Sequence, residues 1–117
     1  MERCEYDKLD HVEGRMWWFA ARDRNLLVLA QRWLACKPGA WPALDAGCGT
    51  GGFLTRLATE FPDRVLFGID LDPLACRRAA AKSARPACAG SVNALPFVDR
   101  AFAVVFSLDV LCHRKVD

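Results

Sequence analysis

Four glycines lie within the six residues from Gly47 to Gly52, between a short apolar segment and an amphipathic one. The preceding residues 43–46 are mostly apolar, and residues 53–61 carry apolar side chains at helical spacing until Pro62. Glycines at such a position let the backbone turn sharply and let a ligand approach without interference from Cβ atoms. This segment therefore predicts a strand, a glycine-rich turn and a helix, with a ligand at the turn.

The alternation of strand and helix patterns continues along the chain. Residues 65–69 are rich in β-branched and aromatic side chains and predict a second strand. Asp72 followed by Pro73 predicts a helix start, with Asp as the N-cap and Pro at the first helical position. Short strands are expected at 87–89 and 103–106. Strands that alternate with helices in this way indicate an α/β fold with a parallel sheet and right-handed crossovers.

The chain before the glycine-rich turn predicts a helical cap. Its apolar residues repeat every three and four positions, as in an amphipathic helix: Leu26, Leu27, Ala30, Trp33 and Leu34. Pro38-Gly39 is expected to end this helix. We therefore expect a cap over 1–38 and an α/β domain over 39–117. The aromatic residues 17–19 are expected to pack in the core rather than line a substrate pocket.

Composition excludes several classes of protein. The 117 residues are 53% hydrophobic and 26% charged with a net charge of +2, which indicates one globular domain without a nucleic-acid footprint. No apolar run approaches the roughly 18 residues of a membrane span, and the N-terminus shows no apolar signal-peptide stretch. The six cysteines form no C-x-x-C pair. We therefore expect free thiols, no metal site and a cytoplasmic location.

The last predicted strand raises the question of completeness. Residues 101–106 are continuously apolar, which is typical of a strand buried on both faces. Such a strand needs covering helices and a neighbouring strand on its free edge, and few residues follow it. We therefore expect the chain to be the front part of a larger domain.

Two acidic residues flank the glycine-rich turn in the predicted fold. Asp70 follows the second strand, where a carboxylate can accept hydrogen bonds from both hydroxyls of a ribose. Gly47, Gly49 and Gly52 also satisfy the G-x-G-x-x-G pattern of dinucleotide-binding proteins, with Asp70 near the expected spacing. Asp45 favours S-adenosylmethionine over a dinucleotide, because a carboxylate repels a pyrophosphate and attracts an ammonium and a sulfonium.

Motif I of class I S-adenosylmethionine-dependent methyltransferases is similar to the run Asp45-x-Gly47-x-Gly49-x-Gly51. Residues 90–97 and 102–113 resemble the later motifs of the subgroup that includes ubiquinone and menaquinone methyltransferases. The resemblance covers residues 43–113. It implies a Rossmann-like core whose parallel sheet has the strand order 3-2-1-4, S-adenosylmethionine as cofactor and a small molecule as methyl acceptor.

The resemblance also implies which residues hold the methionine half of the cofactor. Gly47, Gly49 and Gly51 would line the methionine part and the ribose, together with the neighbouring Ala46. Asp45 would face the methionine amino group, directly or through water.

The remaining cofactor contacts implied by the resemblance lie after the later strands. Asp70 would hold the ribose diol, and Leu71 would lie against adenine. Ser91 and Val92 would sit at the adenine edge, where the family often has Asp in the position of Ser91. Ser107 and Leu108, at the end of the last strand, would approach the methionine side.

The function implied by the resemblance is methyl transfer from S-adenosylmethionine to an unidentified small molecule. No catalytic residue is assigned: His113 is a candidate general base, although a surface or capping role is expected for it. A non-catalytic S-adenosylmethionine-binding fragment is an alternative, and an NAD-binding oxidoreductase is another. Cofactor binding separates the first two hypotheses from the third, and turnover of an acceptor separates the first from the second.

Overall fold

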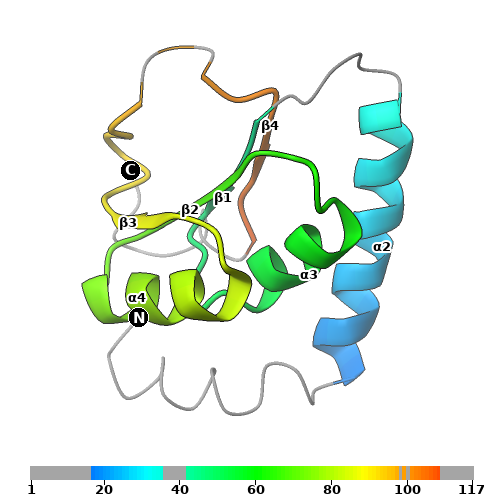
Figure 1. The fold of residues 1–117 in the computed structure, drawn as a ribbon, viewed down its shortest axis with the longest axis horizontal. Coiled ribbons are helices and arrows are strands. Elements are labelled where there is room, and N and C mark those ends of the chain that lie inside the picture. The colour runs from blue at the N-terminus through cyan, green and yellow to red at the C-terminus, as the bar shows by residue number, and fades with distance from the viewer. Residues whose placement is uncertain (1–16, 36–41, 98, 100, 109–117) are drawn as a thin grey trace.

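The structure is a computed structural model that describes residues 17–35, 42–97, 99 and 101–108 (Figure 1). Its elements in chain order are α2 (Trp17–Ala35), β1 (Ala43–Ala46), α3 (Gly52–Glu60), β2 (Leu66–Asp70), α4 (Pro73–Ser83), β3 (Ala87–Ala89) and β4 (Val104–Phe106). The four strands form one parallel sheet in the order β3-β2-β1-β4. The predicted α/β fold and strand order are confirmed, and the predicted strands and the helices α3 and α4 lie within a few residues of their expected bounds.

The parallel register brings the carboxyl ends of the strands to one edge of the sheet. Asp45 of β1 is aligned with Gly68 of β2 and with Phe106 of β4. Asp70, the last residue of β2, is aligned with Ala89 of β3. The chain leaves β1 and β2 at this edge through the glycine-rich turn and through the start of α4, so both acidic residues lie where open α/β sheets bind ligands.

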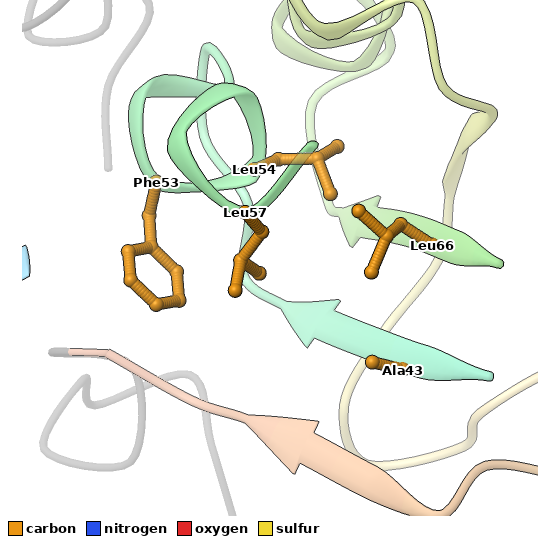
Figure 2. Close-up of a cluster of buried hydrophobic side chains, with 5 residues drawn as sticks. All are labelled: Ala43, Phe53, Leu54, Leu57 and Leu66. Carbon is orange, nitrogen blue, oxygen red and sulfur yellow. The ribbon is translucent and has the colours of Figure 1, made fainter. Parts of the chain in front are cut away.

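One face of the sheet is covered by α3, and this contact forms the main core. Figure 2 shows Phe53, Leu54 and Leu57 of α3 directed toward Ala43 of β1 and Leu66 of β2. All five side chains are at most 3% exposed. The spacing of the three α3 residues puts them on one side of the helix, which is why the amphipathic pattern predicts this element correctly.

The opposite face of the sheet carries a second, smaller cluster of buried side chains. Its members are Leu44, Ala46 and Ile69, with Phe67, Val92, Phe97 and Phe102 packed against them. The sequence predicts that the strand over residues 101–106 needs covering helices, and on this face Val105 is 53% exposed. Val105 aligns with Leu44 in register and so points away from the α3 side, where the described residues place no helix over it.

The start of α4 follows the sequence prediction. The Asp72 side chain accepts a hydrogen bond from the backbone N–H of Leu74 at 2.8 Å, and Pro73 is the first helical residue. Ala84 ends the helix in the left-handed conformation with φ 56°. Asp72 is therefore the N-cap of α4, which supports its interpretation as a structural residue.

Helix α2 packs on α3. Leu26 and Leu27 contact the core cluster beneath α3, and Asp23 is buried with only 2% of its surface exposed. The side chains of residues 17–19 lie outside the described part of the chain, as does His113. Among the described helices, none is both long and apolar enough to cross a membrane.

Candidate functional site

The glycine-rich turn has a backbone that only glycine adopts readily. Gly47, Gly49 and Gly51 have φ values of 90°, 56° and 93°, in the left-handed region where a Cβ atom causes strain. The turn is anchored to the neighbouring strand because the N–H groups of Gly47 and Cys48 both donate to the carbonyl of Ile69, at 2.7 and 2.9 Å. The spacing of the glycines in the sequence is thus explained by the path of the backbone.

Gly51 also lies where two helices approach each other closely. A Cβ atom on Gly51 would stand 2.6 Å from the Cα atom of Ala79 in α4. The start of α3 therefore rests directly on the backbone of α4, and this contact sets the distance between the two helices that flank the turn.

Gly68 is a residue of the site region that sequence reasoning missed. A Cβ atom on Gly68 would stand 2.9 Å from the sulfur of Cys48, so the buried thiol occupies the space above the strand backbone. In the sequence, Gly68 is an isolated glycine within a predicted strand, and such a glycine often marks the close approach of another group to the strand backbone. Cys48 thus acts as a small packing residue beneath the turn.

The Asp70 carboxylate joins two segments at the carboxyl edge of the sheet. Its Oδ2 accepts a hydrogen bond from the N–H of Gly49 at 3.0 Å, and its Oδ1 accepts one from the N–H of Asp72 at 3.1 Å. The carbonyl of Asp70 accepts from the N–H of Gly90 at 2.8 Å. The glycine-rich turn, the start of α4 and the end of β3 therefore all converge on this one residue.

Asp45 adds a second negative charge beneath the turn and is 2% exposed. Burial raises the pKa of the Cys48 thiol well above its ordinary value, and the charges of Asp45 and Asp70 raise it further. The thiol therefore stays protonated near neutral pH and is no nucleophile. The same negative field favours a ligand that carries positive charge at this edge.

The other predicted site residues lie around this centre in different environments. Leu71 is 53% exposed immediately after Asp70. Ser91 follows β3, and its Oγ accepts a hydrogen bond from the N–H of Asn93 at 3.1 Å. Val92 packs against the buried cluster on the sheet face opposite α3, whereas Leu108 packs against the cluster beneath α3.

Ser107 lies directly after β4, next to the end of β1. Its Oγ is buried and has no hydrogen-bond partner among the residues that the structure describes. A buried hydroxyl without a partner costs about 1–3 kcal/mol, so Ser107 is a polar group that a ligand at this edge can satisfy.

The residues present fit S-adenosylmethionine by their chemistry. The open glycine backbone admits a ligand without Cβ interference, and Asp70 offers carboxylate oxygens beside the turn. A buried carboxylate at Asp45 suits an ammonium and a sulfonium and opposes the pyrophosphate of a dinucleotide.

Comparison with known families agrees with this geometry. The family profile described as a methyltransferase domain matches residues 43–117. The chain belongs to this methyltransferase family. The matched region begins at β1 and includes the glycine-rich turn.

Curated relatives that match part of this chain are named as methyltransferases. A malonyl-[acyl-carrier protein] O-methyltransferase from Herminiimonas arsenicoxydans is 41% identical over 68 residues, or 58% of this chain and 26% of the relative. A demethylmenaquinone methyltransferase from Roseiflexus castenholzii is 39% identical over 75 residues, or 62% of this chain and 32% of the relative. The chain thus spans no more than about a third of the length of these relatives.

Solved structures confirm the class I, Rossmann-like fold of this chain. A sugar N-methyltransferase from Streptoalloteichus matches with a TM-score of 0.65 and 30% identity, over 88% of this chain and 39% of that one. An amino pentose methyltransferase from Micromonospora echinaspora, solved with SAM bound, matches with a TM-score of 0.63 and 26% identity, over 92% and 43%. S-adenosylmethionine is therefore the cofactor that the family implies.

Proposed function

We propose that this chain is the cofactor-binding part of an enzyme that transfers a methyl group from S-adenosylmethionine to a small molecule. The observation that carries the proposal is the pair of acidic residues, Asp45 and Asp70, on either side of a turn whose three glycines have positive φ. The family match over residues 43–117 supports the same assignment.

The two carboxylates have different tasks in this proposal. Asp70 accepts hydrogen bonds from the ribose hydroxyls, and Asp45 attracts the ammonium of the methionine part, directly or through water. The backbone at Gly47 and Gly49 lies against the methionine part and the ribose, because no Cβ stands between it and the ligand. Leu71, exposed beside Asp70, lies against the adenine.

Ser91, Val92 and Leu108 complete the proposed cofactor site. Ser91 follows β3, so it stands on the side of Asp70 where a base attached to the bound ribose would extend. Val92 and Leu108 pack against the two apolar clusters on opposite faces of the sheet, and they fix the ends of the segments that border the ligand.

The cofactor supplies an electrophilic methyl group on a sulfonium that leaves readily as a thioether. An acceptor nucleophile forms its bond to the methyl carbon with its own electron pair, and the pair of the broken carbon–sulfur bond returns to sulfur. The contribution of the protein is alignment, because positioning a nucleophile in line with the methyl carbon lowers the entropic part of the barrier.

Calorimetry with the 117-residue chain tests the cofactor assignment. We expect S-adenosylhomocysteine to bind and NAD to show no heat, because Asp45 opposes a pyrophosphate. In the variant Asp45→Asn we expect S-adenosylhomocysteine to bind about tenfold or more weakly, the loss typical of a hydrogen bond to a charged group. The matched control is Asp63→Asn, an exposed acid between α3 and β2. Tighter binding of NAD than of S-adenosylhomocysteine would overturn the proposal.

A further inference from the structure

We propose that Asp70 holds the glycine-rich turn in its binding conformation before any ligand arrives, in addition to contacting the ribose. The observation is the hydrogen bond from the N–H of Gly49 to Oδ2 of Asp70, which joins residues 21 positions apart at 3.0 Å. Both residues are buried. Asp70 is thus a positioning residue for the turn.

The turn needs such a contact because its sequence does not fix its conformation. Glycine loses more backbone freedom on folding than any other residue, and three glycines here adopt positive φ. A hydrogen bond to a carboxylate is shorter and stronger than one between neutral groups. The Gly49 N–H therefore gains a strong acceptor that selects one conformation from the many open to the turn.

The carboxylate is itself oriented from its other side. Oδ1 of Asp70 accepts from the N–H of Asp72 at 3.1 Å, and the Asp72 side chain caps α4 through the N–H of Leu74. The start of α4 thus fixes the plane of the Asp70 carboxylate, which in turn fixes Gly49. The chain of contacts runs from a helix start to the turn without passing through a ligand.

This arrangement gives Asp70 an influence on both halves of the cofactor, an inference that rests on the proposed function. The ribose would contact Asp70 directly, whereas the amino-acid part would contact the turn that Asp70 holds. Loss of the carboxylate should therefore weaken a ligand that has both parts more than a ligand that has the nucleoside alone.

Hydrogen exchange of single amides in the ligand-free chain tests the positioning role without any cofactor. In Asp70→Ala we expect the exchange rate of the Gly49 amide to rise about tenfold or more. The reference is the Ala43 amide, which donates to Val65 at the far end of β1 and should change little. Asp63→Ala serves as the surface control.

A second variant separates a local effect from loss of structure. Asp70→Asn keeps a side-chain oxygen that can accept from Gly49, so its Gly49 amide should exchange more slowly than in Asp70→Ala. An unchanged Gly49 rate in Asp70→Ala, or an equal rise at Gly49 and Ala43 in both variants, would overturn the inference.

Two ligands then test the effect on binding. We expect Asp70→Ala to weaken S-adenosylhomocysteine at least about fivefold more than 5′-methylthioadenosine, which lacks the amino-acid part. Equal losses would mean that Asp70 acts on the ribose alone, which overturns the inference. If the unaltered chain binds neither ligand, the proposed function fails, while the exchange result still decides whether Asp70 holds the turn.

Discussion

Arg56 of α3 forms an ion pair with Asp23 of α2, with 2.9 Å between Nε and Oδ2. The Asp23 side chain is only 3% exposed, and Arg22 also contacts it, at 3.0 Å from Oδ1. A buried carboxylate with two guanidinium partners on two helices ties α2 to the helix that follows the glycine-rich turn. Docking of α2 is thus linked to the helix that begins at the candidate site.

We expect Arg56→Met to lower the free energy of unfolding by about 1–3 kcal/mol. Removing one partner of a buried pair typically costs about 3–5 kcal/mol, but Arg56 is 38% exposed and Arg22 remains beside Asp23. Denaturant unfolding measures the change. Arg24→Met, at an exposed position of α2, is the control, and equal losses in both variants would contradict the importance of the pair.

We expect Gly51→Ala to destabilise the chain by more than about 2 kcal/mol. Two costs combine, because the positive φ strains a Cβ atom and that atom would stand 2.6 Å from the Cα of Ala79. Gly52→Ala is the matched control, since Gly52 is helical and is not among the glycines with positive φ. The midpoint of thermal unfolding should be clearly lower for Gly51→Ala than for Gly52→Ala. Similar midpoints would show that the space between Gly51 and Ala79 can accommodate a Cβ atom.

The sequence predicts the elements of this fold well because each carries a local signal. The apolar spacing of α3, the Asp72-Pro73 start of α4 and the glycine-rich turn all depend on neighbouring residues, and the structure confirms each of them. The order of the strands came from the resemblance to a family rather than from any local signal.

The contacts that sequence reasoning missed are those between distant segments. Asp23 lies in a polar stretch, so nothing in its surroundings indicates burial against Arg56. The bond from Gly49 to Asp70 spans two elements and is visible only once β1 and β2 are paired. The 53% exposure of Val105 depends on what covers that face of the sheet, which its apolar neighbours in the sequence do not indicate.

We expect Asp72→Ala to lower the free energy of unfolding by about 1 kcal/mol through loss of the N-cap of α4. Asp72→Ser keeps an oxygen that can accept from the N–H of Leu74, so it should retain most of the stability. Neither change removes the Asp72 N–H that contacts Asp70. Chemical unfolding measures the free energy of unfolding of both variants. If Asp72→Ser is as unstable as Asp72→Ala, loss of the N-cap does not explain the loss of stability.

We expect the buried thiol of Cys48 to make the chain less stable in alkali. Burial raises its pKa in the folded state, and the negative charges of Asp45 and Asp70 add to the shift. In the unfolded chain the thiol ionises near its ordinary pKa of 9.0. The unfolded state alone gains from ionisation above that pH, so stability is full below pH 9.0 and falls as pH rises toward the folded-state pKa.

Unfolding at about pH 8 and about pH 10 measures this loss, which should reach roughly 1 kcal/mol for each pH unit above the ordinary thiol pKa. Cys48→Ala removes the ionising group, so its free energy of unfolding should fall less over the same interval than that of the unaltered chain. Cys88 is exposed, and Cys88→Ala should leave the alkaline loss unchanged. If Cys48→Ala loses as much stability over this pH interval as the unaltered chain, ionisation of the Cys48 thiol does not cause the alkaline loss of stability.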